Sequence, residues 1–222
     1  MFTIILAESS LELIPKQMQN HPSVSSYSKK FKKNPTKSLL DNSWHFAAMK
    51  DLDNEIKRGR PDIVHLTLLS LCTTPAFFEN KFKVYVHTIN DHVISISNNT
   101  RLPKSYHRFQ GLMEKLFQTK IIESPYETLM KIENLSMSEL ISEIKPDKVI
   151  GLTTKGKKST LIDLVQGMDD NSCIIIGGFQ KGHFSNETDK ILDQSFSIND
   201  RSLEAHLVAS RLAYEYENTI FI

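Results

Sequence analysis

Short apolar runs alternate with helical patterns over most of the chain. Residues 2–7, 148–152 and 173–176 are apolar runs of strand length, each bounded by polar residues or glycine. Such runs indicate buried β-strands. Between the last two, residues 159–165 carry apolar positions at helical spacing, and Ser159 is placed to cap them. Strands that alternate with helices predict an α/β fold, with a mainly parallel sheet covered by helices on both faces.

Further helices are predicted from periodicity and capping signals. Residues 11–14 begin a short helix, and residues 136–144 open with capping-box spacing, Ser-x-x-Glu. A longer helix starts at Asn42 or Ser43 and ends at Gly59, with an apolar face of Trp44, Ala47, Ala48, Leu52 and Ile56. A C-terminal helix carries Leu203, Leu207, Val208, Leu212 and Tyr216. Residues 63–72 fit either a buried strand or a strand running into a short helix, and the pattern leaves both open.

The middle of the chain predicts an extension inserted into a single domain that spans residues 1–222. Residues 83–88 and 92–96 alternate like strands around an Asn-Asp hairpin signal. Ser105 begins a helix to about residue 118, with Gly111 expected to allow close packing, and a short strand follows at 120–123. The extension therefore covers roughly residues 83–122 and has strand, helix and strand in order.

Residues 21–38 change composition to Pro, Ser, Lys and Asn, which is typical of a loop. The segment contains a run of positive charge: Lys29, Lys30, Lys32, Lys33 and Lys37. We expect an inserted basic loop. It is either a solvated loop or a mobile arm attracted to phosphates.

Composition narrows the class of protein. The 222 residues are 40% hydrophobic and 24% charged, with a net charge of +1, as in ordinary soluble globular proteins. Charge alone argues for neither nucleic acid nor membrane as partner. Cys72 and Cys173 are far apart within apolar surroundings, which favours reduced thiols in a cytoplasmic protein. No apolar run is as long as a bilayer span, so we expect no membrane partner.

Three segments follow predicted strands and are rich in Gly, Ser or Thr: residues 153–156, 177–182 and 195–198. In open α/β sheets, ligands bind at the carboxyl ends of strands, so these segments could together hold an adenosine-type ligand. They match neither G-x-G-x-x-G nor a P-loop, which argues against dinucleotide or ATP binding. The histidines lack ligand spacing and no elbow-like nucleophile motif is present, so we expect no metal and no catalytic triad.

A second group of residues is basic: Arg58, Arg60, Arg101, Lys104 and Arg108. Tyr106, His107 and Phe109 interleave with the last of these. Cations with aromatic side chains suit looped RNA, because phosphates need charge and unstacked bases need stacking planes. A solvated face with one core aromatic is the competing interpretation. Asp62 follows Arg60-Pro61 and could cap a helix, pair with Arg60, or act as a general base.

These motifs, taken in order, resemble a known family. The chain reads R-G-R-P-D-I-V-H at 58–65, V-Y-V-H-T at 84–88, R-L-P-K-S-Y-H-R-F-x-G-L-M at 101–113, I-G-G-F-x-x-G-x-F at 176–184 and A-Y-E-Y-E at 213–217. This is similar to the ribosome-biogenesis pseudouridine N1-methyltransferases, a branch of the SPOUT methyltransferases, and the length is of the archaeal type. The resemblance covers nearly the whole chain.

The resemblance implies a C-terminal trefoil knot, a homodimer, and S-adenosylmethionine held in the knot loops. The substrate would be a pseudouridine in a hairpin loop of small-subunit rRNA, methylated at N1, with further contacts to ribosomal proteins or assembly factors. Arg60, Arg101 and Arg108 match RNA-contacting positions. By match, the cofactor-binding residues are Thr153, Thr154, Gly177, Gly178, Phe179, Gly182, Ser197, Ile198 and Leu203.

Two departures stand out. Lys104 stands where the family often has arginine. Lysine keeps the positive charge but cannot bind a phosphate through two parallel hydrogen bonds as arginine does. Gln180 and Lys181 vary the glycine loop.

We expect direct methyl transfer, for which the enzyme mainly aligns donor and acceptor. Asp62 would accept or steer the proton that leaves ring N1, and Arg60 would hold Asp62 or a phosphate. One alternative is a non-catalytic RNA-binding assembly factor of the same fold, which would bind RNA without needing the cofactor. Another is a nucleotide-binding α/β enzyme of a different class, which would bind ATP or NAD and have no basic RNA face.

Overall fold

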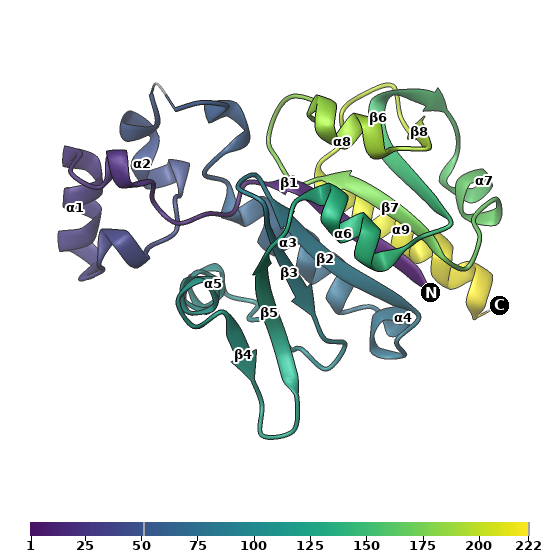
Figure 1. Ribbon diagram of the computed structural model, residues 1–222, viewed down its shortest axis with the longest axis horizontal. Coiled ribbons are helices and arrows are strands. Elements are labelled where there is room, and N and C mark those ends of the chain that lie inside the picture. Colours follow the sequence, from purple (N-terminus) through teal and green to yellow (C-terminus); the bar gives the residue numbers. More distant parts are fainter. Residues whose placement is uncertain (51, 222) are drawn as a thin grey trace.

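The structure is a computed structural model that describes residues 1–50 and 52–221. The described residues form one eight-stranded sheet in the order β4-β5-β3-β2-β1-β7-β6-β8 (Figure 1). Neighbouring strands run parallel from β2 to β8, which confirms the predicted mainly parallel α/β sheet. These parallel strands are β1 (Phe2–Ser9), β2 (Phe82–Thr88), β6 (Lys148–Lys158), β7 (Ser172–Gly177) and β8 (Gln194–Ser197).

An antiparallel part extends the sheet beyond β2. It contains β3 (His92–Ile96), α5 (Tyr106–Thr119), β4 (Ile121–Glu123) and β5 (Thr128–Asn134). The hairpin between β2 and β3 is present as predicted, with Asp91 at φ 53° in its turn. Sequence reasoning missed β5, although its buried Met130 and Ile132 alternate with more exposed neighbours in the strand manner.

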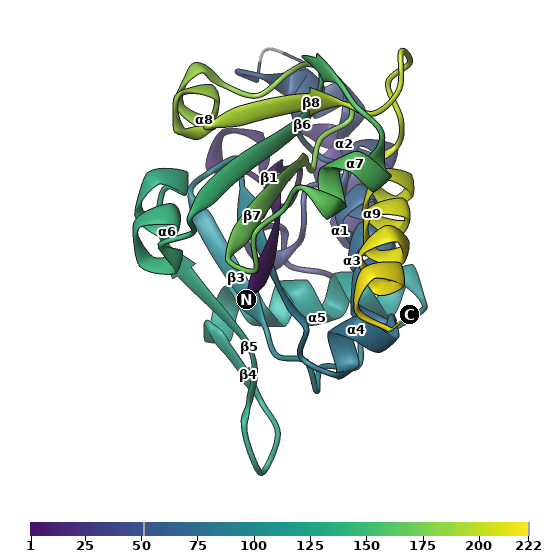
Figure 2. The same ribbon diagram turned by 90° about the vertical axis from the view of Figure 1, so that its right-hand side faces the viewer.

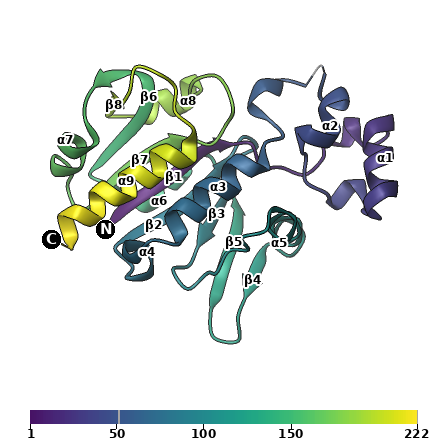
Figure 3. The same ribbon diagram turned by 180° about the vertical axis from the view of Figure 1, so that it is seen from behind.

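Helices cover both faces of the sheet, as expected (Figures 1 and 3). Side chains alternate between the faces of a strand, so Ile4 and Ile174 face one core while Ile5 and Ile175 face the other. The first core also contains side chains from α3 (Pro61–Cys72), α4 (Pro75–Phe78), α5, α7 (Leu161–Gln166) and α9 (Ala205–Ile220). The second contains side chains from α6 (Met137–Ile144), which also contacts α8 (Asn186–Ile191).

The predicted loop at residues 21–38 is wrong. Residues Pro22–Phe31 form helix α1, and Pro35–Lys37 form the short helix η2. The His21 ring accepts a hydrogen bond from the Ser23 N–H, Pro22 occupies the first turn, and Val24 and Tyr27 are buried three residues apart. Histidine is an uncommon N-cap, and the many lysines and serines left only a short apolar pattern. The composition therefore predicted a loop where a helix forms.

The segment between β1 and α3 forms a lobe with its own small core, seen on the left of Figure 1. The lobe holds η1 (Lys16–Met18), α1, η2, α2 (Asn42–Met49) and η3 (Glu55–Lys57). Helix α2 is capped by Asp41 and ends at Met49, so the predicted helix to Gly59 was too long and Ile56 is 53% exposed. Residues 11–14 are not helical, since Leu13 pairs with Leu39 as a β-bridge.

Four local expectations also change. The open choice at residues 63–72 resolves to helix, because α3 runs from Pro61 to Cys72. Residues 153–156 lie within β6 rather than in a loop after it. Thr160, not Ser159, caps α7. Gly111 is exposed, and no atom lies within 4 Å of where its Cβ would be, so it mediates no close packing.

Among the described residues, no helix is both long and apolar enough to cross a bilayer. Cys72 and Cys173 are both buried and unpaired.

Candidate active site

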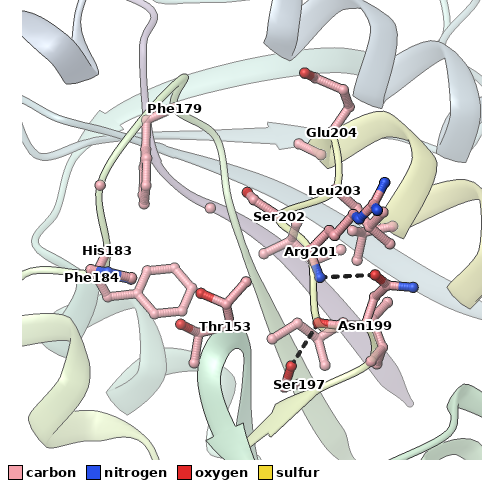
Figure 4. A pocket seen from close by; sticks show the side chains of 18 of the residues that line it. Thr153, Phe179, His183, Phe184, Ser197, Asn199, Arg201, Ser202, Leu203 and Glu204 are labelled. Atoms are coloured by element: carbon pink, nitrogen blue, oxygen red, sulfur yellow. Dashed lines mark hydrogen bonds between the residues drawn. The ribbon is translucent and has the colours of Figure 1, made fainter.

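A pocket of about 540 Å³ opens where β6, β7 and β8 end, at the carboxyl edge of the parallel sheet (Figure 4). It is bounded by the outer half of β6, the loop after β7, and the segment from β8 into α9. Figure 2 shows these segments together around the ends of β6 and β8. Its volume lies within the range of small-molecule and cofactor sites, about 300–1,000 Å³. The three segments singled out from sequence therefore meet around one cavity.

Of the nine predicted cofactor-binding residues, all but Gly178 line this pocket: Thr153, Thr154, Gly177, Phe179, Gly182, Ser197, Ile198 and Leu203. Gly178 instead lies against β1. Its N–H donates to the Ala7 carbonyl at 2.7 Å and its carbonyl accepts from the Ser10 N–H at 2.9 Å. A Cβ there would lie 2.2 Å from Ser9 Oγ, so the absence of a side chain lets the loop sit on β1.

The lining combines apolar walls with polar groups at the rim. Leu152, Ile176 and Val208 offer an apolar surface, while Thr153 and Ser202 bring hydroxyls. The segment after β8 is fixed by its own hydrogen bonds, drawn in Figure 4. Ser197 Oγ donates to the Asn199 carbonyl and the Arg201 N–H donates to Asn199 Oδ1, each at 2.9 Å. Such a cavity fits an adenosine-type ligand with a polar tail.

Several lining residues carried no signal in the sequence: His183, Phe184, Asn199, Arg201, Ser202 and Glu204. Phe184 closes the glycine motif at 176–184 but was not assigned to the cofactor site, and the other five belong to no motif, so the fold brings them to the cavity. Gly182, at φ 108°, holds the loop in a conformation that L-residues rarely adopt.

Arg60 and Asp62 form a bidentate ion pair at the start of α3. Arg60 Nε and Nη2 lie 2.8 and 2.7 Å from the two carboxylate oxygens of Asp62. The hydrogen bond to Asp62 raises the pKa of Arg60, and burial opposes it. The charge of Glu204, a pocket-lining residue, raises it further. The charge of Arg60 therefore interacts with that of Glu204 in the pocket wall, while Arg60 also holds Asp62 in one orientation.

Arg101, Lys104 and Arg108 are exposed around the start of α5, and none makes a side-chain hydrogen bond or ion pair within the described part of the chain. This segment is fastened to α3 by His65, whose ring stacks on Phe109 at 4.4 Å and whose Nε2 lies 2.7 Å from the Pro103 carbonyl oxygen. Phe109 is fully buried, so it is a core aromatic rather than a stacking plane for bases.

Tyr106 links this basic segment to the lobe. Its hydroxyl donates to Asp41, the residue that caps α2. Burial raises the pKa of Tyr106, and the negative charges of Asp41 and Asp62 raise it further. The segment that carries the exposed basic residues is thus joined both to the lobe and, through His65, to α3, the helix whose first turn contains Asp62.

Arg58 differs from the other predicted RNA-binding residues because it is held inside the chain. Its guanidinium pairs with Glu12 through two hydrogen bonds of 2.7 and 2.5 Å, and only 13% of its side chain is exposed. The hydrogen bond to Glu12 raises the pKa of Arg58 against the opposing effect of burial. The sequence placed Arg58 with the RNA-binding group, and the structure gives it this internal partner instead.

The part of the chain that the structure describes contains no group of three or more His, Cys, Asp or Glu side chains that could hold a metal ion.

Fold and site together define an α/β protein with a nucleoside-sized pocket at the carboxyl edge of its sheet and with exposed basic residues around the start of α5. The model of the EMG1/NEP1 methyltransferase family matches residues 4–217. The ribosomal RNA small subunit methyltransferase Nep1 of Thermococcus sibiricus is 38% identical over an alignment of 222 residues that covers 99% of this chain and 99% of its own. The same-named protein of Sulfurisphaera tokodaii is 39% identical over 210 residues, 94% of this chain and 93% of its own.

Among solved structures, Archaeoglobus fulgidus Nep1 bound to S-adenosylhomocysteine aligns with a TM-score of 0.88 at 37% identity. The alignment covers 100% of this chain and 98% of the other. The chain therefore belongs to the EMG1/NEP1 methyltransferase family, which confirms the resemblance inferred from its motifs.

Proposed function

We propose that this protein transfers a methyl group from S-adenosylmethionine to N1 of a pseudouridine in a hairpin loop of small-subunit rRNA. Family membership over residues 4–217 supports the reaction class. The single observation that carries the proposal is the pocket: its three bounding segments are those picked out from sequence, and a relative of the same fold is described with S-adenosylhomocysteine bound.

The pocket residues fit this cofactor. The apolar walls suit an adenine ring, and the hydroxyls and backbone groups near Thr153 and Ser197 suit a ribose and an amino-acid tail. When bound, S-adenosylmethionine supplies an electrophilic methyl group. The protein then has to align that group with the ring nitrogen and exclude water.

Asp62 and Arg60 carry the proton step in this proposal. Ring N1–H is a weak acid, so its proton must leave for N1 to attack. A carboxylate has about four lone-pair sites, so Asp62 retains acceptor capacity while both its oxygens accept from Arg60. Arg60 fixes the carboxylate in one orientation and offers its remaining N–H groups to a phosphate.

Arg101, Lys104 and Arg108 would bind the phosphates that flank the target base, since all three are exposed around the start of α5, which contacts α3. A loop nucleotide can be turned out of its stack at lower cost than one in a duplex. Lys29, Lys30 and Lys32 are exposed around the end of α1 and extend the positive surface onto the lobe. Arg58 is left out of this RNA-binding surface because Glu12 holds it.

The knot, the homodimer and a cytoplasmic location belong to the same proposal. The strand order β7-β6-β8, with the chain then returning to α9 beside α7 and α3, supports a knotted C-terminal segment. Leu66 on α3, Phe78 on α4 and Tyr214 on α9 are apolar or aromatic and 45–62% exposed, which supports a second copy against this layer. Scattering in solution should then give about 51 kDa, twice the 25.4 kDa of one chain. The buried unpaired thiols support a reducing compartment.

Two measurements test the proposed function. Calorimetry with S-adenosylmethionine should give saturable binding. Mass spectrometry of a pseudouridine-containing rRNA hairpin after incubation should show a gain of one methyl group, and the matched uridine hairpin should show none. Equal binding of both hairpins without any mass gain would instead favour an RNA-binding assembly factor. Binding of ATP or NAD in place of S-adenosylmethionine would favour an enzyme of another class.

A further inference from the structure

Lys57, at the end of η3, holds the back of the pocket wall. Its Nζ lies 2.6 Å from Glu8 Oε2 and donates to the His183 carbonyl oxygen. The same ammonium lies 4.4 Å from the centroid of the Phe179 ring. Phe179 and His183 both line the pocket, and only 12% of the Lys57 side chain is exposed. One lysine therefore contacts the pocket loop at two points from behind.

Glu8 fixes the far end of the same loop. It is the last residue but one of β1, takes a positive φ of 49°, and only 8% of its side chain is exposed. Its Oε2 accepts from Lys57, and its Oε1 accepts from the Ser185 N–H at 2.7 Å. Ser185 caps α8, directly after the loop. The two oxygens thus join Lys57 to the start of α8.

A part-buried ion pair is weak evidence for stability, because desolvation costs about as much as the attraction returns. Both members of this pair also hydrogen-bond to the backbone around the pocket loop, Lys57 to the His183 carbonyl and Glu8 to the Ser185 N–H. Burial raises the pKa of Glu8, but hydrogen bonds from Lys57, Ser185 and Thr188, together with the Lys57 charge, lower it below its ordinary value. Glu8 therefore stays ionised at neutral pH, with its two oxygens held by Lys57 and by the Ser185 N–H.

We propose that Lys57 and Glu8 are positioning residues for the cofactor pocket and set the conformation of residues 179–185. The proposal rests on the proposed function, because it assigns the pair to binding of S-adenosylmethionine. Neither residue lines the pocket. They act through Phe179, His183 and Ser185.

The pair also sets the charge behind Phe179. The two groups together carry no net charge, so the intact pair neither favours nor opposes a cationic ligand. Removing Lys57 leaves an unpaired carboxylate, whereas removing Glu8 leaves an unpaired ammonium. S-adenosylmethionine carries one more positive charge than S-adenosylhomocysteine, so its relative affinity should rise without Lys57 and fall without Glu8. A purely structural role would move both affinities equally.

The test uses calorimetry of the full chain with each of the two ligands. For Lys57→Met and Glu8→Gln we expect S-adenosylhomocysteine to bind about tenfold more weakly, the loss of about one charge-assisted hydrogen bond. The ratio of the two affinities should shift in opposite directions. Lys57→Arg, which keeps charge and ring contact, should recover most of the binding. The matched control is Lys33→Met, which removes an ion pair of 2.8 Å between the lobe and Glu114 on α5.

Thermal unfolding without ligand shows whether each variant is folded. Wild-type affinities in Lys57→Met and Glu8→Gln would overturn the proposal, as would a loss equal to that in Lys33→Met. If Lys57→Met does not fold, Glu8→Gln alone decides, because it keeps the lysine and must disfavour the cationic ligand. Wild-type protein that binds neither ligand would instead overturn the proposed function.

Discussion

Arg60 and Asp62 meet through two parallel hydrogen bonds, with Arg60 just before α3 and Asp62 in its first turn. A carboxylate at a helix N-terminus is stabilised by the helix dipole, and here an arginine also fixes its orientation. The Asp62 side chain is still 40% exposed. It is thus both held and reachable, which a group that accepts a substrate proton requires.

Asp62→Asn tests that role. The amide keeps the shape and one acceptor but cannot take the ring proton. We expect the single-turnover methylation rate to fall by about 10²–10⁴-fold, the usual range for a lost general base, with RNA affinity nearly unchanged. Quench-flow and filter binding would give the two quantities. An unaltered rate with unaltered binding would leave Asp62 only an orienting partner for Arg60.

Loss of an exposed basic residue should weaken RNA binding, whereas loss of Arg58 should lower the stability of the fold. Arg108→Ala should weaken hairpin binding and reduce the salt slope of log K by about 0.7–0.9, the value for one phosphate contact. Arg58→Ala should leave that slope unchanged. It should lower the free energy of unfolding by about 3–5 kcal/mol, because Glu12 would remain buried and unpaired. Salt titrations and urea unfolding of both variants would separate the roles, and a reduced slope for Arg58→Ala would contradict this division.

Lys29, Lys30 and Lys32 can be tested as a group. If α1 touches RNA, replacing all three by Gln should lower the salt slope by about 2, roughly 0.7 per lost single-strand contact. Lys33 is kept, because its ion pair with Glu114 joins α1 to α5. An unchanged slope, measured by filter binding from low to high salt, would mean that the lysines only keep the lobe solvated.

Sequence patterns predicted structure correctly where neighbouring residues determine it and failed where distant partners determine it. The run at 173–176 became β7 and the Ser136 capping box opens α6, because each signal needs only neighbours in sequence. Helix α1 depends on a histidine cap and on a core shared with distant residues such as Leu40 and Met49. The internal partner of Arg58 lies 46 residues away. Contacts of that separation leave no pattern in a single sequence.

Two glycines should respond oppositely to alanine. Gly178→Ala should destabilise the fold, because the new Cβ would lie 2.2 Å from Ser9 Oγ and 2.9 Å from Leu6 Cγ. Gly111→Ala should stabilise it by about 0.5–1 kcal/mol, since Gly111 lies within α5 and its Cβ would meet open space. Chemical unfolding measures both. A stabilised Gly178→Ala would mean that the β7 loop does not pack on β1 as described.

Glu8 gives a pH dependence with a definite sign. Its pKa in the folded protein lies below the ordinary 4.5, so the unfolded chain takes up a proton first as pH falls. The stability contributed by Glu8 is therefore fully present above about pH 4.5. It is lost as pH falls through the lower folded pKa, at no more than about 1.4 kcal/mol per pH unit for one proton. Urea unfolding from pH 7 downward should show wild type losing its advantage over Glu8→Gln in this window. A difference between the two that stays constant down to the lowest folded pH would contradict the ion pair with Lys57 as the source of that stability.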